Sequence, residues 1–120
     1  MGRTQEIGNK AEAAAARWLT ENGFTVLDRN WRNGHYELDI VAKKEDTLHF
    51  IEVKCRKLGG LTTPEEAITT AKFRSLSKAA EQYLVTNEIS SEIQFDLVSV
   101  EYSTNGYDIT YIPNAMIARW

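Results

Sequence analysis

A helix-forming segment separates two sets of strand-forming segments, and this order constrains the fold more than any other feature of the sequence. The segment starts with Thr63, Pro64 and Glu66, the pattern of an N-cap, a first-turn proline and a capping-box glutamate. Apolar residues at helical spacing continue from there to about Thr86. A helix between two strands of one sheet carries the chain back, so that those strands can pair in parallel. The sequence therefore predicts a mixed sheet with helices packed on it.

The other segments fit around this crossover. Residues 4–22 carry apolar side chains at helical spacing, and Asn22-Gly23 is a helix stop signal. Strand-forming residues with turn residues between them make up most of the rest of the chain. The expected strands cover residues 24–31, 36–42, 48–56, 93–101 and 107–112. The predicted fold class is α/β, with the order α-β-β-β-α-β-β in a single domain spanning residues 1–120.

Composition limits the classes of protein to which the chain can belong. Its 120 residues, 42% hydrophobic and 26% charged, are typical of one globular domain. No apolar run approaches membrane-spanning length and the first ten residues are polar, so we expect a cytoplasmic protein with no membrane partner. Cys55 is the only cysteine, which excludes an intrachain disulfide and a cysteine-rich zinc site. The net charge of −3 argues against binding nucleic acid through overall charge alone.

Two acidic residues are expected to face one another in the hairpin of residues 36–56. A symmetric loop of either two residues (45–46) or four (44–47) places Asp39 directly opposite Glu52. Like charges in this position destabilise a sheet, and buried carboxylates need a neutralising partner. A divalent cation is the natural candidate for that partner.

The preceding hairpin is expected to turn at Asn33-Gly34, the strongest two-residue hairpin signal. That turn places Asp28 opposite Asp39, where Asp28 either joins the acidic pair or lies at an exposed sheet edge. Strand alternation puts Leu38 and Ile40 together on the face opposite Asp39.

Lys54 lies two residues after Glu52 and therefore on the same strand face. Asp39, followed on the next strand by Glu52-Val53-Lys54, resembles the core motif of the PD-(D/E)XK nuclease superfamily. A longer pattern resembles the YraN-like bacterial family, which is similar in its core to archaeal Holliday junction resolvases. The residues that carry this second resemblance are Gly8, Glu12, Ala15, Leu19, Gly23, Asn30-Trp31-Arg32, Glu37-Leu38-Asp39, Phe50-Ile51-Glu52-Val53-Lys54, Arg56 and Lys72.

The resemblance implies a restriction-endonuclease-like fold, with an α-β-β-β-α-β core and a mixed central sheet flanked by helices. It implies that Glu12, Asp39 and Glu52 bind a divalent cation, Mg²⁺ or Mn²⁺. Asp39, Glu52 and Lys54 are then the catalytic residues. The chain departs from the nominal superfamily motif at Leu38, which takes the place of the proline before Asp39.

Three basic residues are candidates for contacts with nucleic acid. Arg56 follows Lys54 on the same strand face, within reach of a backbone phosphate. Arg32 and Lys72 belong to the residues that match the family pattern. Taken one at a time, such residues are more often part of a solvated surface.

These features together predict a metal-dependent DNA endonuclease that hydrolyses phosphodiester bonds. A bound cation and the Lys54 ammonium suit this reaction because both stabilise negative charge that develops on phosphate. The resemblance implies recognition of DNA structure rather than sequence, with branched DNA as a candidate substrate. Because cutting both strands of a junction needs two symmetric sites, we expect a homodimer.

Two other hypotheses fit the same sequence. The chain is alternatively a non-catalytic nucleic-acid-binding or assembly module that retains a vestigial metal site. A third possibility is a protein-interaction domain in which the carboxylate pair is a coincidence. Cleavage, DNA binding without cleavage, and the absence of metal binding distinguish the three.

Overall fold

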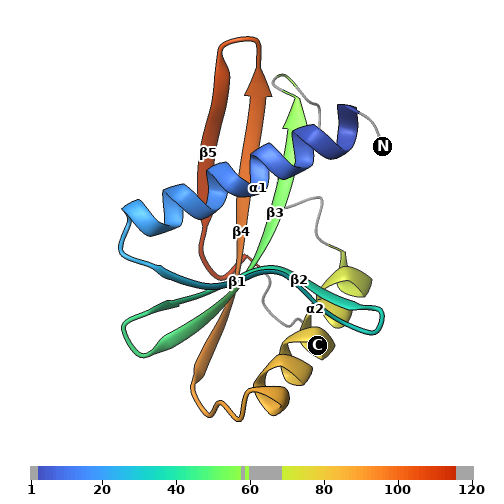
Figure 1. Cartoon of the computed structure of the whole chain (residues 1–120), viewed down its shortest axis with the longest axis vertical. Helices are drawn as coiled ribbons and strands as arrows, with labels where there is room; N and C mark the ends of the chain where they lie inside the picture. Colours follow the sequence, from blue (N-terminus) through green and yellow to red (C-terminus); the bar gives the residue numbers. More distant parts are fainter. Residues whose placement is uncertain (1–2, 58, 60–68, 116–120) are drawn as a thin grey trace.

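The computed structural model describes residues 3–57, 59 and 69–115. The described residues form two helices and five strands (Figure 1). In chain order the elements are α1 (Arg3–Glu21), β1 (Thr25–Asn33), β2 (Tyr36–Lys44), β3 (Thr47–Lys57), α2 (Thr70–Thr86), β4 (Glu92–Ser103) and β5 (Gly106–Ile112). The predicted order of helices and strands is confirmed.

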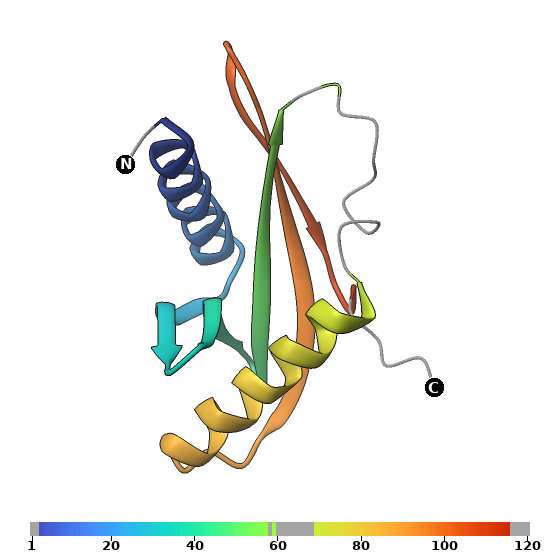
Figure 2. The ribbon, with the colours of Figure 1, turned by 90° about the vertical axis from the view of Figure 1, so that its right-hand side faces the viewer.

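The strands form one mixed sheet in the order β1-β2-β3-β4-β5. β3 and β4 pair in parallel, whereas the other neighbouring strands pair antiparallel. α2 lies in the crossover between the two parallel strands, as the sequence order requires. α1 covers one face of the sheet and α2 the other (Figure 2). The prediction of an α/β fold with a restriction-endonuclease-like core is thus confirmed.

Each helix packs over its own hydrophobic cluster. Ala11, Ala15 and Leu19 place small and branched side chains of α1 against the sheet, and all three are fully buried. On the other face, Leu76 and Tyr83 of α2 pack against the apolar side chains of β2 and β3. Neither described helix is long and apolar enough to cross a membrane.

α2 begins at Thr70, not at the capping pattern around Thr63. Thr69 has an extended backbone, with φ −94° and ψ 165°, and its hydroxyl accepts a hydrogen bond of 3.1 Å from the Lys72 amide. Thr69 is therefore the N-cap, and the prediction of an unbroken helix from Thr63 to Thr86 is wrong. The predicted capping residues 63, 64 and 66 lie outside the described residues.

The β1–β2 hairpin turns at Gly34-His35 rather than at Asn33-Gly34. Asn33 is the last residue of β1 and pairs with Tyr36. Gly34 takes the first loop position with φ 63°, which suits a type II′ turn. The sequence correctly predicts Gly34 as a turn residue, but it places Gly34 second in the two-residue loop, whereas the structure has it first.

This turn changes the partner of Asp28. Asp28 pairs with Val41, so the prediction that it lies opposite Asp39 is wrong. Its carboxylate instead accepts a hydrogen bond of 2.6 Å from the Tyr83 hydroxyl, which connects β1 to α2. Asp28 is thus neither part of the acidic pair nor free at the sheet edge.

β2 and β3 pair over only part of their length. The ladder runs from Lys44 and Thr47 to Ile40 and Ile51, in the predicted register and with the two-residue loop. Beyond that last pair the β1–β2 hairpin turns away from β3 (Figure 1). We call the region where the two strands separate, bounded by Asp39 and Glu52-Val53, the fork.

The separation of the strands also changes which way β2 side chains point. Ile40 belongs to the hydrophobic cluster beneath α1, whereas Leu38 and Val41 belong to the cluster beneath α2. The prediction that Leu38 and Ile40 share a face is therefore wrong. The simple alternation fails at Asp39, where the ladder with β3 has ended.

Candidate functional site

Asp39 and Glu52 lie together at the fork, but they do not form the predicted ladder pair, because the pairing of β2 with β3 ends at Ile40 and Ile51. Asp39 follows the last ladder pair, and its Oδ2 accepts a hydrogen bond of 2.9 Å from the Val53 amide of β3. The Asp39 side chain therefore satisfies a backbone donor that lies beyond the end of the ladder. This contact holds the Asp39 carboxylate beside Glu52, the residue before Val53.

Glu52 is a nearly buried carboxyl group, with 5% of its side chain exposed. Its burial, a hydrogen bond with Asp39 and the charge of Asp39 raise its pKa from 4.5 to about 8. The positive charges of Lys72 and Lys54 act in the opposite direction. Lys72 Nζ lies 3.2 Å from Glu52 Oε2. Asp39 and Glu52 thus behave as a carboxylate pair in which Glu52 readily takes up a proton.

Glu12 reaches the same region from α1. Burial and the charge of Asp39 raise its pKa above the ordinary value, whereas Arg29 and a hydrogen bond with the Asn30 side chain lower it. Arg29 Nε lies 3.7 Å from Glu12 Oε1. Asn30 has a left-handed backbone conformation, with φ 53°, within β1 next to Arg29. Glu12 thus lies near enough to Asp39 for their charges to interact, while its direct ionic partner is Arg29.

The candidate basic residues lie in different surroundings. Lys54 and Lys72 are close enough to Glu52 to affect its pKa. Arg56 lies farther along β3, where its Nη2 is 3.6 Å from Glu101 Oε1. Arg32 is exposed on the β1–β2 hairpin and forms an ion pair with exposed Glu37. The structure thus brings Lys54 and Lys72 to the carboxylates and gives Arg56 and Arg32 other ionic partners.

Arg56 nevertheless has unused donors. Its Nε and Nη1 atoms are buried and have no hydrogen-bond partner. A guanidinium nitrogen without a partner is costly to bury, so these donors would gain from an added acceptor. A phosphate oxygen is one such acceptor.

The carboxylates have unused acceptor capacity that suits a divalent cation. Glu12 Oε1 and Glu52 Oε2 are buried and have no hydrogen-bond partner. Carboxylate oxygens are the ligands that Mg²⁺ and Mn²⁺ prefer. No three acidic, histidine or cysteine side chains among the described residues are grouped as a formed metal site. The carboxylate oxygens of Glu12, Asp39 and Glu52 are the right chemical type for such an ion, although their positions among the described residues do not form a ready-made site.

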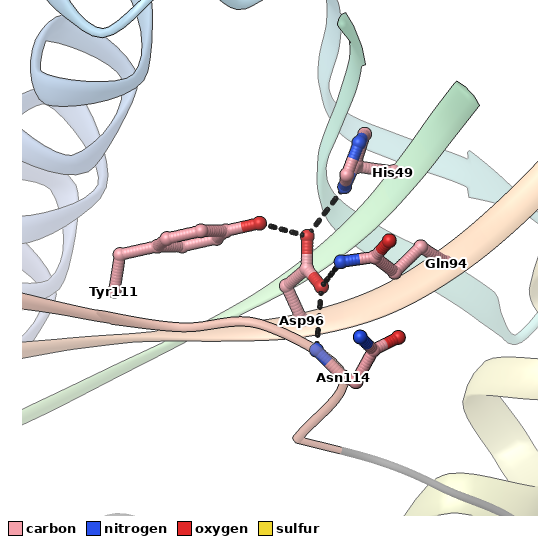
Figure 3. A network of polar contacts seen from close by, with 5 residues as sticks. All are labelled: His49, Gln94, Asp96, Tyr111 and Asn114. Atoms are coloured by element: carbon pink, nitrogen blue, oxygen red, sulfur yellow. Dashed lines mark hydrogen bonds and ion pairs between the residues drawn. The ribbon is translucent and has the colours of Figure 1, made fainter. Parts of the chain in front are cut away.

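A second buried polar cluster lies on the α1 face of the sheet, and the sequence did not reveal it (Figure 3). Asp96 of β4 is fully buried and accepts four hydrogen bonds. The donors are His49 Nδ1 at 2.6 Å, Tyr111 Oη at 2.7 Å, Gln94 Nε2 at 2.9 Å and the Asn114 amide at 2.9 Å. Because an ionised carboxylate only accepts, the His49 Nδ1 carries the proton. This saturated cluster joins β3, β4 and β5 and leaves Asp96 little capacity for a further ligand.

Sequence reasoning also missed Arg29 and Asn30 beside Glu12. Their role depends on the contact between β1 and α1, which no local pattern predicts. Asp96 had a usable signal, since it is the single acidic residue inside the apolar run of residues 93–100. A lone charge in such a strand requires several partners.

Among solved structures, Pyrococcus furiosus SfsA in complex with Ca²⁺ is similar to this chain at 13% sequence identity and a TM-score of 0.37. The match covers 92% of this chain and 63% of that chain. Similarity at this level assigns neither a fold nor a function.

Sequence comparisons are more informative. The model of a family described as "Uncharacterised protein family UPF0102" matches residues 11–100. A UPF0102 protein of Parabacteroides distasonis is 38% identical over 118 residues, which are 98% of each chain. One from Syntrophomonas wolfei subsp. wolfei is 39% identical over 112 residues, covering 92% of this chain and 97% of that relative. The chain belongs to the UPF0102 family, in agreement with its resemblance to the YraN-like proteins.

Proposed function

We propose that the chain is a metal-dependent DNA endonuclease that hydrolyses phosphodiester bonds at the fork. The observation that carries this proposal is the buried Glu52 carboxyl beside Asp39, with Lys54 on the same strand face. Glu52 is buried beside the partly exposed Asp39, and its Oε2 has no hydrogen-bond partner. Such an arrangement is costly, and perturbed groups of this kind gather at functional sites. Asp96, by contrast, is a buried carboxylate in this fold whose oxygens take part in four hydrogen bonds.

Asp39, Glu52 and Glu12 would hold one or more divalent cations, Mg²⁺ or Mn²⁺. When bound, such a cation supplies a water that is nucleophilic near neutral pH and a countercharge for phosphate. The Val53 amide fixes the direction of the Asp39 carboxylate. The Lys54 ammonium stabilises the negative charge that develops on the phosphate oxygens and orients the attacking water.

The proposed substrate is DNA recognised by its structure, including branched DNA. The Arg56 side chain is 25% exposed on β3, and its guanidinium would turn outward to meet a phosphate. Lys72 reaches from the first turn of α2 to Glu52 at the fork. Arg32 would contact the backbone farther out, on the β1–β2 hairpin. These contacts address the phosphate backbone and read no base sequence.

The proposal includes a homodimer, which would provide two active sites for the two strands of a junction. β5 is the last strand of the sheet, and its ladder with β4 is regular from Leu97 and Ile112 to Ser103 and Gly106. Its residues 106–112 include one charged side chain, Asp108, and neither lysine nor proline. An edge strand with so few protective features is suited to pairing with a second copy. Sedimentation equilibrium would show a dimer if this part of the proposal holds.

Cleavage of DNA tests the catalytic role. We would incubate the wild-type protein, Lys54→Ala and the control Lys43→Ala with linear and four-way-junction DNA at low salt, with Mg²⁺ or EDTA. Lys43 is exposed on β2 and pairs with Thr25 and Leu48, away from the fork. The proposal predicts Mg²⁺-dependent cleavage by the wild type and the control, with at least a hundredfold slower cleavage by Lys54→Ala. DNA binding without cleavage of any substrate would instead support the non-catalytic module.

A further inference from the structure

Lys72 occupies an unfavourable position in its own helix. It lies in the first turn of α2, which the Thr69 cap fixes through the Lys72 amide. A helix N-terminus carries partial positive charge, so a cationic side chain there is destabilising. This turn contains no acidic residue that would offset the charge. The opposing charge comes from β3, where Glu52 Oε2 lies 3.2 Å from Lys72 Nζ.

The contact between Lys72 and Glu52 is ionic but not fully hydrogen-bonded. Glu52 Oε2 is buried and has no hydrogen-bond partner, although the ammonium is nearby. The Lys72 side chain is 38% exposed, compared with 5% for Glu52. Lys72 thus serves as the counter-ion of Glu52 whenever that carboxyl is ionised, while its own long, flexible chain stays accessible from solvent. Such a cation can leave the carboxylate without leaving water.

We propose that Lys72 is an exchangeable counter-ion. It neutralises Glu52 when the carboxylates hold no divalent cation, and moves to a DNA backbone phosphate when they do. This inference rests on the proposed metal-dependent nuclease function and specifies how the site couples its two ligands. Cation binding at Glu52 and the Lys72–Glu52 ion pair are then mutually exclusive. DNA binding and cation binding consequently strengthen one another.

The arrangement at Glu12 follows the same logic. Arg29 lies 3.7 Å from Glu12 Oε1, another buried oxygen without a hydrogen bond, and 43% of its side chain is exposed. Glu12 and Glu52 are therefore each paired with a partly exposed basic side chain of the protein, Arg29 and Lys72 respectively. With the internal cations in place, the site presents little free positive charge to a phosphate. A divalent cation would replace them at the carboxylates and leave the region with surplus positive charge.

The coupling can be measured by DNA binding without any cleavage. We would measure the affinity of wild type, Lys72→Met and Lys78→Met for a fluorescent duplex by anisotropy, in EDTA and in Ca²⁺. Lys78 is an exposed lysine of the same helix and controls for the loss of one positive charge. The wild type and Lys78→Met should bind DNA more tightly in Ca²⁺. This enhancement should shrink at least fivefold in Lys72→Met. Equal enhancement in Lys72→Met and wild type would overturn the proposal.

A second measurement needs no variant. Lysine acetylation by acetic anhydride, quantified by mass spectrometry, reports the accessibility of the Lys72 amine in wild-type protein. Adding Ca²⁺ should increase Lys72 labelling several-fold relative to Lys78, because the amine leaves its carboxylate. Calorimetric titration of Ca²⁺ into the unlabelled protein shows separately whether the cation binds. It therefore distinguishes failure of the Lys72 exchange from failure of the proposed function. Cation binding without a change in Lys72 labelling would contradict the exchange alone, whereas no cation binding at all would contradict the proposed function as well.

Discussion

The Val53 amide donates a hydrogen bond of 2.9 Å to Asp39 Oδ2, immediately past the point where the β2–β3 ladder ends. One carboxylate thus terminates the ladder and belongs to the candidate site. The structural and chemical roles of Asp39 are separable, because the hydrogen bond needs an oxygen acceptor whereas cation binding needs a negative charge.

Asp39→Ala should destabilise the protein more than Asp39→Asn. Asparagine keeps a side-chain oxygen for the Val53 amide, whereas alanine leaves that part-buried donor without its partner. We expect Asp39→Ala to lower the free energy of unfolding by about 1–3 kcal/mol, with Asp39→Asn within about 1 kcal/mol of wild type. Urea denaturation in EDTA measures both. Equal losses for the two variants would show that the amide contact has no role in stability.

Glu52 should make the metal-free protein less stable as the pH rises. Its pKa is raised from 4.5 to about 8 in the folded state. Between these two pH values the folded protein therefore binds more protons than the unfolded chain. The favourable contribution of protonated Glu52 is complete below about pH 4.5 and is lost as the pH rises through about 8. Glu52→Gln removes this titration. We would measure the free energy of unfolding of both proteins from pH 5 to pH 9. As the pH rises, the wild type should lose stability relative to Glu52→Gln. A difference that stays constant would refute the raised pKa of Glu52.

The Tyr83–Asp28 hydrogen bond should contribute to stability by holding α2 to β1. Burial and the Asp28 carboxylate raise the pKa of Tyr83, which keeps its hydroxyl protonated as the donor. Removing that donor with Tyr83→Phe should cost about 1–3 kcal/mol, the range for hydrogen bonds to charged groups. Tyr107→Phe, at an exposed tyrosine of β5, is the matched control and should lie within about 0.5 kcal/mol of wild type. A double-mutant cycle with Asp28→Ala, which removes the acceptor, would isolate the pair, and a coupling energy near zero would contradict this role.

The Asp96 cluster should be structural and independent of the candidate site. Asp96→Asn replaces one acceptor oxygen with a donor, although four donors point at this side chain. We expect a loss of at least about 3 kcal/mol, typical of a broken buried network. Asp108→Asn, at an exposed position of β5, serves as the control. Cation affinity per folded molecule should not change in either variant, and its loss in Asp96→Asn would place the cluster in the functional site.

Much of the fold follows from local patterns, and the errors occurred where tertiary contacts compete with them. The β2–β3 register was predictable because the loop at residues 45–46 fixes it symmetrically. The β1–β2 register was not, because Gly34 suits either of two turn positions and tertiary contacts decide between them. Similarly, the capping pattern at Thr63 gave no indication that α2 begins after Thr69, whose side chain caps it.

The candidate site was predictable to the extent that it depends on strand register. The hairpin register and the spacing of two residues along β3 indicate that Asp39, Glu52 and Lys54 lie near one another, although the ladder itself ends at Ile40 and Ile51. The ion pairs of Glu12 with Arg29 and of Glu52 with Lys72 join elements distant in sequence. Those contacts depend on how far β2 diverges from β3, which alternation alone does not specify.

The most direct test of a functional fork is calorimetric titration of Mn²⁺ and Mg²⁺ into wild type, Asp39→Asn and Asp46→Asn. Asp46 lies exposed in the loop at the other end of the same hairpin, so its variant matches the change in charge and chemistry. A functional fork predicts saturable cation binding to wild type and Asp46→Asn, with at least a tenfold loss of affinity in Asp39→Asn. Equal affinity in all three proteins, or no binding to the wild type, would contradict it.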